Sequence, residues 1–194
     1  MARIVINDLD PAIYSFWDSA VNRSEDFLDI FDATTVSLDE WDLQKEIYKR
    51  ADLSRPTELG FATFFLNRTN RSGVLNAGVI GGRKQEAADK INARFNREKL
   101  RARLEWLGTM RERITVSNDD GLYCIKKHLD NPNAFVYADP PYFEIATFIS
   151  MLSTSQITES LLNCSDRDRP HYGCLATTEH PRYWSFMLAS RSVH

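Results

Sequence analysis

An acid, two prolines and a tyrosine stand together at 139–142, directly after the apolar segment 134–138. At the end of a buried strand, Asp139 could accept a hydrogen bond from the exocyclic amine of a nucleobase, and the carbonyl of Pro140 could accept the second hydrogen. The lone pair of such an amine is delocalised into the ring, and these two acceptors favour the tetrahedral nitrogen that attack on a methyl group requires. The segment therefore fits chemistry on a planar amine.

The two prolines make this turn stiff, because Pro140 and Pro141 fix φ and remove two N–H donors. Their carbonyls then stay directed at a ligand, and Tyr142 offers a ring face that can stack on a base. An ordinary strand exit is the alternative, in which the prolines end the sheet and Tyr142 fills a gap in the packing.

Strand-like and helix-like segments alternate along the chain before this motif. Asp10 with Pro11 is typical of a helix start, and Ser37 with Glu40 forms a capping box for the next helix. Apolar spacing predicts strands at 3–7, 114–117 and 134–139, and helices after 10 and 37, over 57–66, over 85–108 and over 122–129. This alternation predicts an α/β sheet whose ligands lie at the carboxyl ends of the strands.

A contact loop is predicted after the helix at 57–66, because the sequence changes there to hydrogen-bond donors and small residues. The segment 67–73 is Asn-Arg-Thr-Asn-Arg-Ser-Gly, and Gly-Val-Ile-Gly-Gly follows at 78–82. Donors on a flexible backbone are typical of binding loops.

Charge is distributed unevenly, although the net charge of the 194 residues is only −3. Acidic residues dominate before residue 67, whereas twelve basic residues stand against five acidic ones at 68–113. A surface that faces phosphates has this composition. For residues 97–113 taken alone, a solvated helical face explains the charges equally well.

Several other classes of protein are disfavoured. No apolar run reaches the roughly 18 residues of a membrane span, and no signal-like segment opens the chain, so we expect a cytoplasmic protein without a membrane partner. The three cysteines, Cys124, Cys164 and Cys174, form neither an even set nor a Cys-x-x-Cys pair, which favours reduced thiols. With His171 and His180, the last two match no zinc spacing, and we expect no metal site.

Three segments together resemble the Dam-like (DPPY-type, class alpha) DNA adenine methyltransferases. Residues 7–14, Asn-Asp-Leu-Asp-Pro-Ala-Ile-Tyr, resemble the second strand and acidic motif of that family. The segments 67–73 and 78–82 resemble its DNA-contacting signature, and 139–142 resembles its catalytic motif. The three occur in family order and cover residues 1 to about 142, and their conjunction is far more specific than any one of them.

This resemblance implies an incomplete Rossmann-like, S-adenosylmethionine-dependent methyltransferase sheet with a helical DNA-recognition insertion. Residues 1–34 and 114–143 would form a partial catalytic domain, 35–113 a mainly helical target-recognition insertion, and 144–194 a divergent tail. The implied reaction is methylation of the exocyclic amine of adenine in DNA, in a restriction–modification or phage-defence setting. Double-stranded DNA and a cognate restriction endonuclease are the implied partners, and the chemistry needs no metal.

The resemblance also implies roles for the acids. Asp8 would hold the ribose hydroxyls of S-adenosylmethionine, the methyl donor, with a helix-capping or solvated acid as the alternative. Asp119 would contact the adenine of the cofactor, although Asp120 is equally close. Asp139, in the turn formed with Pro140 and Pro141, would polarise the target amine, and Tyr142 would stack on an adenine flipped out of the duplex.

In the DNA-contacting segment, the resemblance implies contacts from Asn67, Arg68, Asn70, Arg71 and Ser72. Arg71 and Ser72 would meet the space that the flipped base leaves. Asn67 and Arg68 have a structural alternative, in which they brace the loop against the sheet.

The chain also departs from the family pattern. The first strand of the family, with its aromatic-x-Gly-x-Gly turn, is absent before residue 3, and that strand lies between the second and fourth strands of this sheet class. We therefore expect a gap in the middle of the sheet. After residue 143 the family's Asp-His and Ser-Tyr-Asp-like segments are not visible, and an altered reading frame in the gene is our hypothesis for this tail.

Two alternative functions stay open. One is an RNA guanine methyltransferase with a similar Asp-Pro-Pro-Tyr turn; such enzymes generally lack a long basic insertion, which this chain has. The other is a nonenzymatic DNA-binding remnant built on residues 60–113.

Overall fold

The structure is a computed structural model, which describes residues 2–128, 131, 134–139 and 185–191. The chain divides into two compact units, Met1–Asp10 with Ser117–His194, and Pro11–Val116. The first unit contains most of a small sheet and the second is mainly helical, so the mixed α/β class is confirmed. The functional boundaries expected at residues 34, 113 and 143 stay predictions.

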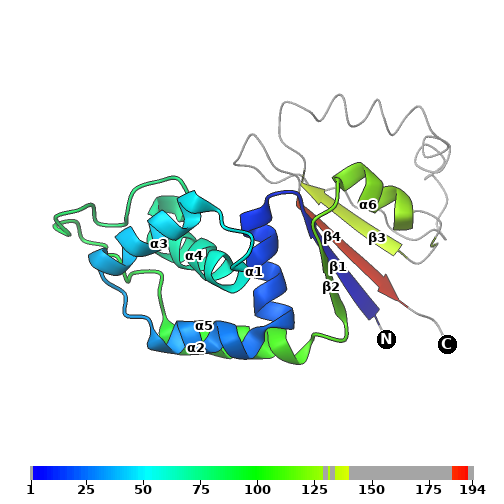
Figure 1. Cartoon of the computed structure of the whole chain (residues 1–194), viewed down its shortest axis with the longest axis horizontal. Helices are drawn as coiled ribbons and strands as arrows, with labels where there is room; N and C mark the ends of the chain where they lie inside the picture. Colours follow the sequence, from blue (N-terminus) through cyan, green and yellow to red (C-terminus); the bar gives the residue numbers. More distant parts are fainter. Residues whose placement is uncertain (1, 129–130, 132–133, 140–184, 192–194) are drawn as a thin grey trace. The chain divides into compact units, whose positions relative to one another are not determined.

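Four strands form the sheet, in the order β2-β1-β4-β3 (Figure 1). The strands are β1 (Ala2–Asp8), β2 (Ile114–Ser117), β3 (Ala134–Asp139) and β4 (Ser185–Arg191). The first three confirm the strands predicted from apolar spacing. The fourth was not predicted, and it comes from the segment that the sequence analysis treated as a divergent tail.

Strand β4 occupies one of the two inner positions of the sheet and pairs antiparallel with both β1 and β3. The gap expected between those two strands is therefore filled, but by a strand of the opposite direction to the one the family pattern places there. For this reason the described strands do not confirm a Rossmann-like sheet.

Helix α6 (Gly121–His128) belongs to the same unit and confirms the helix predicted at 122–129 to within a residue. Its Cys124 packs in a small cluster with Ala134, Val5 and Val136. Burial raises the pKa of the Cys124 thiol above its usual value. The thiol is thus a small core side chain and not a nucleophile.

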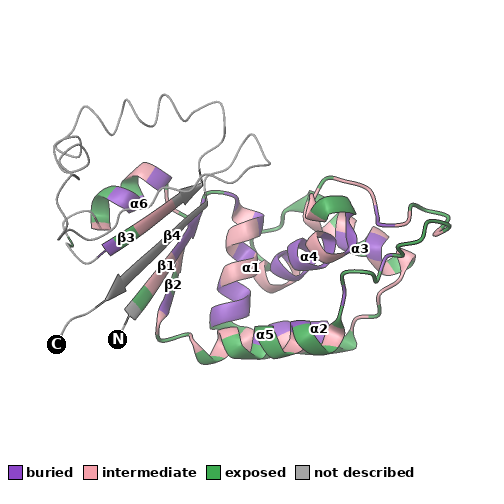
Figure 2. Cartoon of the chain, turned by 180° about the vertical axis from the view of Figure 1, so that it is seen from behind, coloured by how far each residue is buried: buried purple, intermediate pink, exposed green. Residues whose placement is uncertain are grey.

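The helical unit is built around α4 (Pro56–Thr69), whose residues 59–66 are all buried (Figure 2). This confirms the buried helix predicted at 57–66. A Cβ on Gly60 would lie 2.4 Å from the backbone oxygen of Ser15, so α4 and α1 approach too closely for any side chain there. The other elements are α1 (Pro11–Asn22), α2 (Ser24–Ala33), α3 (Leu38–Arg50), η1 (Arg71–Gly73) and α5 (Arg97–Thr109).

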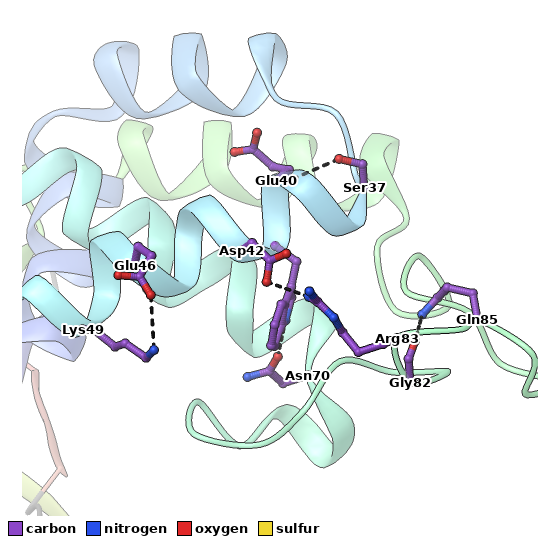
Figure 3. Close-up of polar contacts among 10 residues, drawn as sticks. Ser37, Glu40, Asp42, Glu46, Lys49, Asn70, Gly82, Arg83 and Gln85 are labelled. Atoms are coloured by element: carbon purple, nitrogen blue, oxygen red, sulfur yellow. Dashed lines mark hydrogen bonds and ion pairs between the residues drawn. The ribbon is translucent and has the colours of Figure 1, made fainter.

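The predicted capping box is partly visible at α3, where the Glu40 N–H donates to Ser37 Oγ at 3.1 Å (Figure 3). Helix α2 was not predicted from the sequence. It buries Phe27 and Phe31, one turn apart, in a ring cluster with Phe64. Aromatic burial therefore stabilises a helix that lies in a strongly acidic stretch of sequence.

The helix predicted over 85–108 is wrong in its first half, because α5 begins only at Arg97. Gln85 has a positive φ of 53°, and its side chain donates to the Ile80 carbonyl at 2.7 Å and accepts from the Ile91 N–H at 2.8 Å. These bonds hold the preceding segment in turns. Asn96 then caps α5 by accepting from the Lys99 N–H at 3.0 Å.

No helix in the described part of the chain has the length and hydrophobicity needed to cross a membrane.

Candidate functional site

Two of the predicted site acids end β1 and β3, the two strands that flank β4 in the sheet. In the strand register, Ser185 of β4 pairs with Asp8 on one side and with Asp139 on the other. The carboxyl ends of β1 and β3 therefore lie level, two inter-strand spacings or about 10 Å apart. Pro140, Pro141 and Tyr142 lie outside the described residues.

A buried amide ties the third predicted acid to the same end of the sheet. Asn7, 1% exposed, accepts at Oδ1 from the Asp119 N–H at 2.9 Å and from Ser117 Oγ at 2.7 Å. Its Nδ2 donates to the Asp119 carbonyl at 2.9 Å. Asn7 thus holds both backbone groups of Asp119 next to the end of β1.

Asp8 is itself buried, at 3% exposed. Its Oδ1 accepts from the Asp10 N–H at 2.9 Å, which closes a short turn after β1, and its carbonyl accepts from Asn118 Nδ2 at 2.6 Å. The carboxylate is therefore fixed at the carboxyl end of a strand, the position where α/β folds bind ribose hydroxyls.

The neighbouring Asp120 caps α6, because its Oδ1 accepts a hydrogen bond from the Tyr123 N–H at 3.0 Å. The sequence alone left Asp119 and Asp120 as equal candidates for the cofactor contact. The structure shows that the Asp120 carboxylate is engaged in capping, and the contact of Asp119 with the cofactor stays a prediction.

The segment predicted to contact DNA forms a closed loop in the helical unit, and we call residues 67–80 the recognition loop. Asn70 forms an antiparallel bridge with Val79, the Arg71 N–H donates to the Gly78 carbonyl at 3.0 Å, and the Ile80 N–H donates to the Thr69 carbonyl at 2.9 Å. These bonds close the loop at its base. Residues 71–78, which this base encloses, form the tip of the loop.

The tip carries two of the predicted DNA contacts in exposed positions. Arg71 and Ser72 are both exposed, and Ser72 has a positive φ of 54°. A Cβ on Gly78 would lie 3.1 Å from Nη2 of Arg71, so the glycine leaves room for the arginine to lie across the loop. Both side chains are available to a ligand.

Asn70, by contrast, is fully buried and holds the loop from inside. Its Nδ2 donates to the carbonyls of Val74 at 3.0 Å and Leu75 at 2.8 Å, and its Oδ1 accepts from Trp41 Nε1 of α3 at 2.7 Å (Figure 3). Three hydrogen bonds on one buried amide fix the path of the loop. A direct contact of Asn70 with DNA stays a prediction, and the geometry gives it a bracing role.

Asn67 and Arg68 form a second brace. Asn67 Nδ2 donates to the Gly73 carbonyl at 3.0 Å, and Arg68 donates to Asn67 Oδ1 from Nε at 3.0 Å and from Nη2. Partial burial lowers the pKa of the Arg68 guanidinium, and the nearby charges of Arg94 and Arg103 lower it further. Like charges therefore surround a half-buried arginine at the base of the loop.

We expect Trp41→Phe to lower the free energy of unfolding by about 1–2 kcal/mol, because it leaves the buried Asn70 Oδ1 without its indole donor. Chemical denaturation of both proteins measures the difference. The control is Trp106→Phe, since Trp106 is 57% exposed, and that change should alter stability by less than about 0.5 kcal/mol. Equal effects of the two substitutions would show that the Trp41–Asn70 bond contributes nothing.

The sequence did not predict the bracing roles of Asn7 and Trp41. Asn7 belongs to the segment 7–14 that carries the resemblance, but only its position beside Asp8 hinted at a role. Trp41 gave no signal beyond helical spacing, because its partner Asn70 lies in a distant segment.

The chain matches a protein-family model. The model of the D12 class N6 adenine-specific DNA methyltransferases matches residues 1–160, which include all the predicted site residues. No significant match was found among curated proteins or among solved structures.

Proposed function

Because the chain belongs to the D12 class N6 adenine-specific DNA methyltransferase family, we propose that it transfers the methyl group of S-adenosylmethionine to the exocyclic amine of an adenine in duplex DNA. The family confirms the resemblance seen in the sequence and supports DNA over RNA as the substrate. The donor, the extrusion of the base and the roles of single residues are the proposed part.

The observation that carries this proposal is the gathering of three acids at one end of the sheet. Asp8 and Asp139 lie level across Ser185, and Asp119 is tied to Asn7 next to Asp8. A site for a nucleoside donor needs carboxylates for its polar groups, and the transfer needs one more at the amine. Asp8 and Asp119 can bind the methyl donor, and Asp139 can bind the amine.

Asp8 and Asp119 fit a site for S-adenosylmethionine, because a buried carboxylate at a strand end can accept hydrogen bonds from ribose hydroxyls. Asp8 would bind these hydroxyls, and Asp119 would hold the adenine end of the donor. When bound, the donor supplies an electrophilic methyl group on a sulfonium. The chain itself would contribute orientation, which is the larger part of catalysis in such an in-line displacement.

At the target base, Asp139 would accept a hydrogen bond from the amine and stabilise the positive charge that builds on its nitrogen. Tyr142 would stack on the base and the Pro140 carbonyl would accept the second amine hydrogen. Because the amine is inaccessible inside a duplex, the adenine would leave the stack, which costs a few kcal/mol. Arg71 and Ser72, at the tip of the recognition loop, would meet the space that the flipped base leaves in the duplex.

A restriction–modification or phage-defence context, with a cognate endonuclease and a cytoplasmic location, completes the proposal. The nonenzymatic remnant is the competing proposal, because it needs only the helical unit. Both include DNA binding, and they differ in whether the chain binds the methyl donor.

Methyl transfer from labelled S-adenosylmethionine tests the proposal directly. We expect incubation with methyladenine-free duplex DNA to place the label in N6-methyladenine after digestion to nucleosides. An equal amount of RNA should receive none. Label in a different base would overturn the adenine specificity, and DNA binding without transfer and without heat of binding for the donor would support the remnant.

A further inference from the structure

The arginines of the basic stretch 68–113 fall into two groups. One group is paired with acidic side chains: Arg83 pairs with Asp42 at 2.6 Å, and Arg101 pairs with Asp32 at 3.0 Å and with Glu105. The other group has no acidic partner within ion-pair distance among the described residues. Its members include Arg68, Arg71, Arg94 and Arg103.

Two of the unpaired arginines, Arg68 and Arg94, lie at the base of the recognition loop, and the charge of a third, Arg103, acts on Arg68. Both terminal nitrogens of Arg94 would lie 3.2 Å from a Cβ on Gly73, the residue whose carbonyl Asn67 holds. Arg68 is bonded to the same Asn67, and Arg94 and Arg103 are close enough to Arg68 to lower its pKa. The guanidinium groups of Arg94 and Arg68 thus lie close to the same two residues, Gly73 and Asn67, and Arg103 of α5 adds a third positive charge that acts on Arg68.

Gly73 leaves space for the arginine cluster. Gly73 has a φ of +75°, which disfavours any side chain at this position, and it leaves the space over which the Arg94 guanidinium lies. Arg94 and Arg103 are exposed, whereas Arg68 is half-buried. Two of the five Arg68 donors are used on Asn67, and the others are left for a ligand.

Like charges that act on one another repel, and an anion with several oxygens offsets this repulsion while it accepts hydrogen bonds from the remaining N–H donors. A phosphodiester backbone offers such oxygens at regular spacing, and arginine binds them bidentately. We propose that Arg68, Arg94 and Arg103 form a phosphate clamp that anchors the DNA backbone at the base of the recognition loop, beside the tip that recognises the bases.

This inference rests on the proposed function for its partner, duplex DNA, but it makes a separate claim. Contacts to phosphates position a protein on DNA without carrying sequence information. The clamp should therefore act on every duplex alike, and its signature is the salt dependence of binding, because each neutralised phosphate releases counterions.

The test is the affinity of the full chain for a short duplex of mixed sequence, measured by fluorescence anisotropy over a range of salt concentrations. We expect Arg94→Gln and Arg103→Gln each to reduce the slope of log affinity against log salt by about 0.9, and the double variant by about 1.8. Arg94→Lys keeps the charge and should retain most of the slope.

The matched control is Arg101→Gln, two residues from Arg103 on the same helix but paired with Asp32 and Glu105. Its slope should equal that of the unmodified chain. Circular dichroism establishes that each variant is folded, and both substituted arginines of the clamp are exposed.

The outcomes separate the two claims. If the unmodified chain binds with a steep salt dependence and the double variant keeps the same slope, the clamp is wrong and DNA binding stands. If Arg101→Gln reduces the slope as much as Arg94→Gln, the clamp is also wrong, because charge alone then matters. If the unmodified chain does not bind the duplex, both the clamp and the proposed DNA partner are overturned.

Discussion

Asp139→Asn should reduce methyl transfer by about 100-fold or more, with little change in the affinity for DNA or for S-adenosylmethionine. The amide keeps the size of the side chain and one hydrogen-bond acceptor, but it removes the negative charge. As methyl transfer proceeds, positive charge builds on the amine nitrogen, and the carboxylate stabilises it with a full negative charge that the amide lacks. The loss should therefore fall on the rate of the chemical step.

A single-turnover assay with labelled S-adenosylmethionine separates this step from binding. The control is Asp52→Asn, because Asp52 is an exposed acid whose carboxylate bonds only locally, to Ser54. It removes the same charge from the protein and should leave the rate unchanged. A comparable drop in both variants, or a rate loss explained entirely by weaker DNA binding, would remove Asp139 from the chemistry.

The position of this acid was predictable because local signals agreed. The apolar segment 134–138 predicts a strand, and the prolines at 140 and 141 predict where it must end, so β3 stops at Asp139 as expected. The start of α1 at Pro11 and the extent of β2 were predictable for the same reason. Each depends on residues that are neighbours in the sequence.

The errors arose where specific hydrogen bonds, and not the local apolar pattern, decide the structure. The Gln85 side chain bonds to residues on both sides of it and prevents a helix that the apolar spacing favours. Strand β4 is stabilised by its pairing with β1 and β3, and no local pattern in residues 185–191 predicts this strand. Side-chain bonds to the backbone override the helical preference in the first case, and tertiary pairing decides the structure in the second.

The candidate site shows the same division. The types of the acids Asp8, Asp119 and Asp139 were evident from the sequence, and so was the donor-rich loop. That Asp8 and Asp139 lie level across Ser185, and that Asn7 holds Asp119, follows only from the register and the side-chain bonds. The structure thus adds the positioning residues to a list of candidate contacts.

Asn7→Ala should lower the free energy of unfolding by about 2 kcal/mol and weaken S-adenosylmethionine binding by about tenfold or more. The substitution leaves the Asp119 N–H, the Asp119 carbonyl and the Ser117 hydroxyl without the amide that now binds all three. Asp119 is only partly buried, so water replaces some of these bonds. Thermal unfolding and calorimetric titration with the donor measure the two effects.

Ser117→Ala is the matched control, because it removes one bond to Asn7 and keeps both bonds that hold Asp119. It should lower stability by about 1 kcal/mol and leave the donor affinity nearly unchanged. If it weakens the donor as much as Asn7→Ala does, general loosening of the sheet explains the effect, and Asn7 has no special part in binding.

A double-mutant cycle decides whether Asn7 acts through Asp119. Asn7 holds the backbone of Asp119, and the proposed contact with the donor is made by the Asp119 side chain. In a chain that already carries Asp119→Ala, the further change Asn7→Ala should therefore cause little additional loss of affinity, while its effect on stability persists. Fully additive losses of affinity would mean that the two residues act independently, and the positioning role of Asn7 would then be wrong.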